Sequence, residues 1–197
     1  MGNPLLQKNY SASAAVAANR IVARTATDGT SAQAAAATDK LHGVCAEVGP
    51  AAGERFDVVE FGLADVQFGG NVVAGDELTS DANGMAIAVT PPRIHQAGIA
   101  GGAAGAHTVT GIATTDSLIS VKALDVTDAT KSLTDITAQC TISAANTIDN
   151  TGGTNTTGLF LFVTYRNQDV HIVGVAENSG ALDEIGVCRV EPRILRA

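Results

Sequence analysis

The stretch that most constrains the fold runs from Gly62 to Val89, where short apolar runs alternate with turn-forming residues. The apolar runs are Leu63–Val66, Asn71–Ala74 and Met85–Val89. Gly-Gly, Ala-Gly-Asp and Asp-Ala-Asn-Gly separate them. Glycine accepts positive φ, and Asp and Asn close turns through hydrogen bonds to nearby backbone groups. Runs of strand length divided by such turns predict a tight antiparallel β-meander.

Strand-like segments continue before and after this meander. Val44–Val48 and Arg55–Phe61 flank a loop of Gly, Pro and Ala, which predicts a hairpin. The segment Gly43–Val59 has an echo in Gly174–Val190. Both segments open with Gly-Val, carry two Glu seven residues apart around a Gly-containing loop, and end on a Val-rich strand. We therefore expect the second hairpin to belong to the same sheet or barrel as the first.

The segment between the two hairpins is predicted to be an insertion. It begins with the Ala/Gly-rich sequence AGIAGGAAGA, which by composition is a flexible tether. Four apolar strands follow, and the most hydrophobic, Leu159–Tyr165, is predicted to be a central strand. The expected fold is all-β, with a small β-sandwich at residues 94–167 inserted into a small β-barrel domain formed by residues 39–93 and 168–197.

The first 38 residues are rich in Ala, Ser, Thr and Asn and show no stable apolar stripe. We expect residues 1–38 to form an extended, weakly ordered arm that becomes ordered by lying on a partner. The sizeable apolar side chains of this segment are the candidate contacts with that partner: Leu5, Leu6, Tyr10 and Val16.

Composition narrows the class of partner. The net charge is −8, from 20 acidic and 12 basic residues, and no basic cluster occurs. Nucleic acid and anionic membranes are therefore not expected as direct partners. The apolar fraction of 45% is carried by small side chains, so subunit contacts are expected to add to a modest core. Three cysteines without metal spacing predict reduced, structural thiols, although a Cys45–Cys188 bridge stays open.

Residues for catalysis or metal binding are hard to find in this sequence. The four histidines lack metal-ligand spacing and are expected at the surface or at strand ends. Asp76, Asp81 and Asn83 look like half of a calcium loop, but the bidentate Glu at its far end is missing, so turns explain them better. No Gly-x-Ser-x-Gly elbow occurs, which leaves a β-fold hydrolase as a residual alternative. We expect no enzyme activity, no metal and no cofactor.

The order of the turn motifs resembles that of the capsid cement, or head decoration, proteins of tailed bacteriophages. The matching positions are Gly43–Val44, Ala51–Glu54, Val58–Gly62, Gly69–Asp76 and Ser80–Gly84. The closing segment IVGVAENSGALDEIGVCRV is similar to the last strands of that family. The resemblance covers residues 39–90 and 170–195, and the 94–167 insertion departs from it.

This resemblance implies a small β-barrel or tulip-like protein, often a homotrimer, without catalytic residues or a cofactor. It implies binding to the major capsid protein on the outer surface of the expanded capsid, after assembly in the bacterial cytoplasm, with an N-terminal arm that commonly docks on the capsid. The alternative is a phage tail or fibre component, or an adhesin-like module, whose inserted sandwich recognises a glycan or protein on the host surface.

Overall fold

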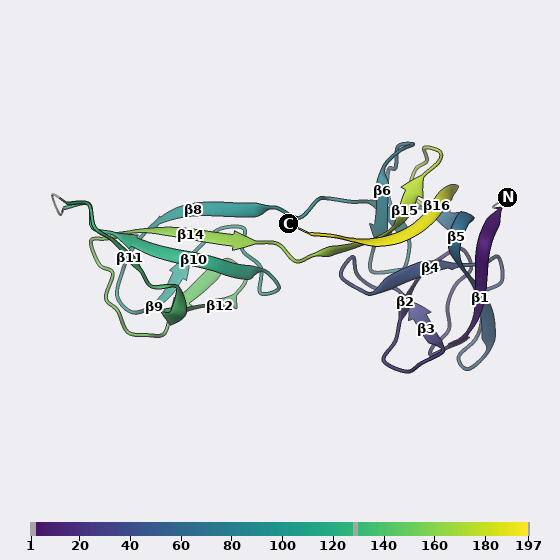
Figure 1. Ribbon diagram of the computed structural model, residues 1–197, viewed down its shortest axis with the longest axis horizontal. Coiled ribbons are helices and arrows are strands. Elements are labelled where there is room, and N and C mark those ends of the chain that lie inside the picture. The colour runs from purple at the N-terminus through teal and green to yellow at the C-terminus, as the bar shows by residue number, and fades with distance from the viewer. Residues whose placement is uncertain (1–2, 128–129, 197) are drawn as a thin grey trace. The chain divides into compact units, whose positions relative to one another are not determined.

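The computed structural model describes residues 3–127 and 130–196, and within these ranges the regular secondary structure consists almost entirely of β-strands (Figure 1). The helical content of these ranges is one 3-10 turn, η1 (Thr137–Gln139). The chain divides into two compact units. Unit 1 contains residues up to Pro91 together with Asp169–Arg196, and unit 2 contains Pro92–Gln168. The predicted all-β class is confirmed.

The first five strands of unit 1 close into a barrel in the order β1-β3-β2-β4-β5, because β1 also pairs with β5. The strands are β1 (Pro4–Ala12), β2 (Ile21–Arg24), β3 (Thr30–Gln33), β4 (Leu41–Cys45) and β5 (Arg55–Gln67). Only the β1–β3 pairing in this ring is parallel. Closure leaves none of these five strands as a free edge.

The prediction of an extended arm over residues 1–38 is wrong. Strands β1, β2 and β3 lie in this segment and are three of the five strands of the barrel. Tyr10 and Val16 are buried with Val22, Phe56 and Val58 in one core cluster. A narrow barrel is filled by its own side chains, and here small residues such as Ala12 leave room for large ones such as Tyr10 and Phe56. The Ala-rich and Ser-rich composition suggested a loose chain, but it suits this tightly packed interior.

Strand β5 is shared between the barrel and a second group of strands. Its first half pairs with β1, and its second half, from Gly62 to Gln67, pairs with β16. The φ of Gly62 is +104°, and a Cβ on Gly62 would lie 2.5 Å from the backbone nitrogen of Leu5. Only glycine fits this turning point, where the strand passes from one set of partners to the other.

The second group of strands extends the sheet beyond β5 in the order β16-β15-β6-β7. These strands are β6 (Glu77–Ser80), β7 (Ala86–Ala88), β15 (Val170–Ala176) and β16 (Ile185–Leu195). The expectation that the closing hairpin joins the sheet of the first hairpin is confirmed, since β16 pairs with β5. The closed barrel itself, however, uses residues 4–67, and residues 170–195 lie outside it.

Three of the predicted turns are closed by the same kind of hydrogen bond, from a backbone N–H to an acidic side chain three residues later. The backbone N–H of Ala51 donates to Glu54 Oε2 at 2.8 Å, and that of Ala181 donates to Glu184 Oε2 at 2.8 Å. In a third turn the N–H of Val73 donates to a carboxylate oxygen of Asp76 at 2.8 Å. The acidic residue at the end of each turn therefore caps the residue that opens it. This explains why the two hairpins resemble each other in sequence.

The calcium-like pattern is also a turn. One carboxylate oxygen of Asp81 accepts the backbone N–H groups of Asn83 and Met85, each at 2.8 Å. Within residues 3–127 and 130–196, no group of three or more His, Cys, Asp or Glu side chains is placed to hold a metal ion. The three cysteines of this part of the chain are free and buried, and burial raises the pKa of Cys45 to about 11 and that of Cys188 to about 12.

Unit 2 contains two sheets, ordered β11-β10-β14-β8 and β12-β13-β9, that share one buried cluster including Val121, Leu161 and Ile148. The strands are β8 (Ile94–Ala100), β9 (Gly105–Thr108), β10 (Ser117–Leu124), β11 (Leu133–Asp135), β12 (Cys140–Ala144), β13 (Thr147–Asn150) and β14 (Phe160–Arg166). As expected, β14 is a central strand, paired on both sides.

The prediction of a flexible Ala/Gly tether at the start of unit 2 is wrong. The predicted tether covers residues 97–106, of which 97–100 belong to β8 and 105–106 to β9, with a four-residue connection between them. Strand β8 pairs with β14 over its whole length without a register shift. The small residue Gly98 is required there, because a Cβ on it would lie 2.6 Å from the ring of Phe160. The glycine provides space for an aromatic ring rather than flexibility.

Candidate functional site

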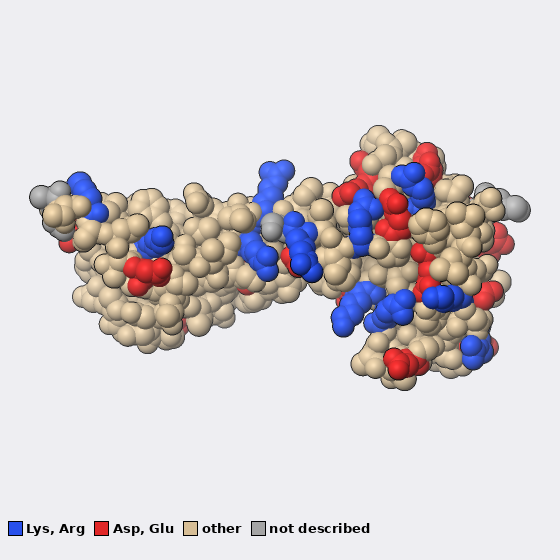
Figure 2. Space-filling view, in the orientation of Figure 1, with Lys and Arg blue, Asp and Glu red and all other residues tan. Residues whose placement is uncertain are grey.

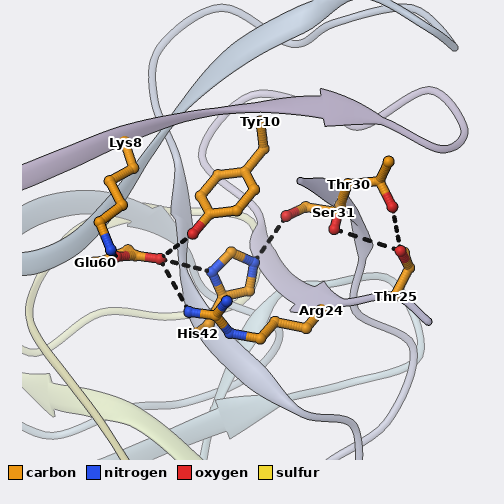
Figure 3. Close-up of polar contacts among 8 residues, drawn as sticks. All are labelled: Lys8, Tyr10, Arg24, Thr25, Thr30, Ser31, His42 and Glu60. Atoms are coloured by element: carbon orange, nitrogen blue, oxygen red, sulfur yellow. Dashed lines mark hydrogen bonds and ion pairs between the residues drawn. The ribbon is translucent and has the colours of Figure 1, made fainter. Parts of the chain in front are cut away.

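The densest set of polar side chains in unit 1 surrounds Glu60 in β5 (Figure 3). Glu60 Oε1 accepts the Tyr10 hydroxyl at 2.5 Å and an Arg24 N–H at 3.2 Å. Glu60 Oε2 pairs with Lys8 Nζ at 2.8 Å. One carboxylate thus joins three side chains from β1 and β2, in what we call the Glu60 network (Lys8, Tyr10, Arg24, Ser31, His42 and Glu60).

His42 enters this network from β4 through a β-bulge. Leu41 lies opposite Ala23 and Gly43 lies opposite Val22, so His42 is the extra residue. A bulge turns the side chain of its extra residue to a new direction. Here His42 Nδ1 lies 3.3 Å from Glu60 Oε1, and Nε2 lies 2.9 Å from the Ser31 hydroxyl.

Protonation states follow from the environment of the Glu60 network. Burial alone would raise the pKa of Glu60, but hydrogen bonds from Lys8, Tyr10 and His42 outweigh it and hold that pKa at about 2. Burial lowers the pKa of His42, so the imidazole is neutral at pH 7. A neutral ring has one N–H, so Nδ1 donates to Glu60 and Nε2 accepts the Ser31 hydroxyl.

Ser31, His42 and Glu60 are connected in the order of a Ser-His-acid triad. A triad serine has to reach the carbonyl carbon of its substrate. The Ser31 hydroxyl cannot, because Ser31 is fully buried and His42 is only 4% exposed. The arrangement instead ties every barrel strand to its neighbours: β1 gives Lys8 and Tyr10, and β2 to β5 give one residue each (Arg24, Ser31, His42 and Glu60). We assign this network to rigidity rather than to catalysis.

His42 and His107 each lie one residue from a strand end, as expected, but both are buried rather than at the surface. His42 is buried because the bulge directs it to a carboxylate that lies on the interior side of β5. His107 pairs opposite Ile148 in the three-stranded sheet of unit 2.

The structure separates the four predicted partner-contact residues into two pairs. Tyr10 and Val16 are buried in the barrel core and present no surface to a partner. Leu5 and Leu6 are exposed, at 73% and 43%. Leu6 lies opposite Phe61, which is itself 48% exposed. Leu5, which precedes Leu6, is the extra residue of a bulge between Pro4 and Leu6. We call Leu5, Leu6 and Phe61 the apolar strip; sequence reasoning missed Phe61, because the β1–β5 pairing was not foreseen.

A groove of about 450 Å³ lies on the same pair of strands. Its walls include Pro4 and Gln7 from β1 and Val59 and Leu63 from β5. The groove and the apolar strip both use β1 and β5. A surface with exposed large apolar side chains on a rigid support is typical of a protein–protein contact.

No family model matches the sequence, and no curated protein matches it. Among solved structures, the chain is similar to the crystal structure of the head fiber gp8.5 N base in bacteriophage phi29. The identity is 12% and the TM-score 0.43, over 94% of this chain and 93% of that one. No helix in the described part of the chain is long and apolar enough to cross a membrane.

Proposed function

We propose that this chain is a structural protein of a tailed-phage virion that binds the outer surface of the expanded capsid and stabilises the head. The observation that carries the proposal is the apolar strip, held on a closed barrel that the Glu60 network braces across all five strands. The sequence resemblance to head decoration proteins supports it independently, since its motifs are the acid-capped turns described above.

The mechanism of stabilisation is binding linkage. A protein that binds the expanded lattice and not its disassembled subunits stabilises that lattice by its own binding free energy. A rigid binder loses little conformational entropy on docking, which favours affinity. Closure of β1 into the barrel serves this purpose, because it presents Leu5 and Leu6 from an ordered strand.

A homotrimer is part of the proposal. Three tethered copies raise the effective concentration of each contact at neighbouring capsomers. The small side chains of the chain also leave a modest core for a monomer, so assembly would add buried area. Sedimentation equilibrium tests this, with an expected mass about three times the 19.9 kDa of the chain.

The contact is tested by co-sedimentation with purified expanded capsids that lack the protein. The double variant Leu5→Ser, Leu6→Ser should raise the dissociation constant by at least about tenfold, since both side chains are exposed and their loss leaves the core unchanged. The matched control is Val73→Ser, Leu182→Ser, which removes two other exposed apolar side chains from unit 1. Equal affinity of both double variants and the unmodified chain would exclude the apolar strip as the contact.

A further inference from the structure

Unit 2 carries an aromatic surface that the proposed function does not use. In β14 the side chains of Leu161, Val163 and Tyr165 are buried in the shared core. Phe160, Phe162 and Thr164 alternate with them and face away from that core. Phe162 is 45% exposed, which is unusual for so large an apolar side chain at the centre of a sheet.

The strand register arranges this outer face in three rows. Phe160 lies level with Ala100 and Leu124, and Phe162 lies level with Gly98 and Lys122. Thr164 lies level with Gln96 and Ser120, so the third row consists of hydroxyl and amide groups. The outer face is therefore apolar at the Phe160 row and carries hydrogen-bonding side chains at the Thr164 row.

The two aromatic rings are held in a defined arrangement. Their centroids lie 5.1 Å apart with an interplanar angle of 66°. The ring of Phe160 lies over Gly98, where any Cβ would meet it at 2.6 Å. Because Gly98 leaves this space, Phe160 lies against β8, while Phe162 stays exposed beside it.

The same face forms a groove of about 540 Å³, within the usual range for small-ligand sites. Its lining includes Phe160, Phe162, Lys122, Gln96 and Thr164. Lys122 lies level with Asp135 of β11, whose pKa is lowered by hydrogen bonds from Thr137 and by the charge of Lys122, so a ligand here meets both a cation and a carboxylate. The face of unit 2 visible in Figure 2 is largely free of charged side chains, in contrast to that of unit 1.

The apolar and polar rows of this groove together favour one class of ligand. A purely apolar partner would bury the amide and hydroxyl row without hydrogen bonds, at a cost. A purely polar ligand would gain nothing from Phe162. A pyranose ring has an apolar face of C–H groups and a rim of hydroxyls, and so satisfies both parts of the groove at once.

We propose that the outer face of the β11-β10-β14-β8 sheet is a saccharide-binding site. One sugar ring stacks on Phe162, and its hydroxyls exchange hydrogen bonds with Gln96, Ser120, Thr164 and Lys122. This site is separate from the apolar strip of unit 1, so it neither requires nor replaces capsid binding.

The test uses the full chain on an array of immobilised bacterial surface polysaccharides and of hexose, hexosamine and uronate oligosaccharides. The strongest hit is then titrated by isothermal calorimetry. Phe162→Leu keeps an apolar side chain but removes the ring, and it should weaken binding about tenfold or more, roughly 1.4 kcal/mol. Gly98→Val, which displaces Phe160, and Thr164→Val, which removes one hydroxyl without changing the shape, should each weaken it by a smaller factor.

The matched control is Ile119→Ala, an equally exposed apolar residue of β10 that does not line the groove. It should bind the saccharide as the unmodified chain does. The proposal is overturned if no saccharide is retained, if Phe162→Leu and Ile119→Ala bind alike, or if Phe162→Leu changes the oligomeric state, which would mean that a second copy covers this face. Capsid co-sedimentation of Phe162→Leu should be unchanged, so failure here is distinguishable from failure of the capsid proposal.

Discussion

The two units of the chain reach a stable fold by different means. Residues 92–168 contain four basic and five acidic residues, so most of the net charge of −8 belongs to unit 1. Between described residues, every ion pair within 4 Å lies in unit 1. Unit 1 combines a closed barrel and an attached sheet with ion pairs between side chains, whereas unit 2 is a sandwich of nearly balanced charge held by its apolar core. Under the proposed function, this difference gives unit 1 the rigidity that attachment to a capsid needs and lets unit 2 present an open face.

The largest effect should come from removing one core side chain in each unit. Phe68→Ala in unit 1 should cost about 3–5 kcal/mol and Leu161→Ala in unit 2 about 2–5 kcal/mol, since both side chains are fully buried. Hydrogen exchange with mass spectrometry should show faster exchange confined to the unit that carries the substitution. If either variant raised exchange equally in both units, they would not be separate folding units.

Gly62→Ala tests whether the turning point in β5 is needed. The positive φ and the 2.5 Å approach to the Leu5 nitrogen should together cost about 2–4 kcal/mol. Urea denaturation measures this cost. Gly53→Ala is the control, since its φ is also positive but nothing lies within 4 Å of the added Cβ. Equal losses for the two variants would show that the packing of β1 against β5 is not the constraint.

Glu60→Gln should weaken the Glu60 network that links the barrel strands. It removes the charge from hydrogen bonds with Lys8, Tyr10 and Arg24 and should cost about 1–3 kcal/mol at pH 7. In the unmodified chain the pKa of Glu60 is about 2 when folded, below its unfolded value. Its stabilisation is therefore complete above the unfolded pKa and is lost as the pH falls toward 2.

The pH dependence of the unfolding free energy shows whether the effect of Glu60→Gln comes from the carboxylate charge. The pKa of His42 is also lowered by burial, so acidification below its unfolded pKa destabilises the folded state in the same direction. In Glu60→Gln the loss near the carboxylate pKa should shrink, so its unfolding free energy should depend less on pH below about pH 4.5. If denaturant titrations of Glu60→Gln gave the same fall in unfolding free energy at low pH as the unmodified chain, the Glu60 carboxylate would not be the group that stabilises the barrel.

The smallest effect should come from an exposed ion pair of unit 1. Arg193 pairs with Glu77 at 2.5 Å and with Glu191 at 3.0 Å, and all three side chains are partly exposed. Arg193→Ala should cost about 0.2–1 kcal/mol, and less at high salt, as surface pairs do. A loss as large as that of Glu60→Gln would show that the network around Glu60 has no special role.

Local turn chemistry explains what the sequence made predictable. The Ala51–Glu54 and Ala181–Glu184 turns carry their own capping carboxylate, so both hairpins could be placed without knowledge of the fold. The high hydrophobicity of Leu159–Tyr165 predicted a central strand, and β14 is one. These features depend on residues a few positions apart.

The rest depends on pairings between distant residues. Closure of the barrel needs β1 to pair with β5, about fifty residues along the chain, and no local pattern records that. The apolar strip of unit 1 and the groove on the outer face of the β11-β10-β14-β8 sheet also depend on pairings between distant residues. One signal was overlooked: Phe56, Val58 and Glu60 share a strand face by alternation, and a carboxylate on an apolar face needs buried partners.

The most direct test of the central claim is cryo-electron microscopy of expanded capsids before and after addition of the full chain. Difference density should appear on the outer surface, with unit 1 seated on the shell and Leu5 and Leu6 of β1 at the contact. Leu5→Ser, Leu6→Ser should lose that density at the same protein concentration, whereas Val73→Ser, Leu182→Ser should keep it. Bare capsids with the unmodified chain, or density in which unit 2 makes the contact, would contradict the account.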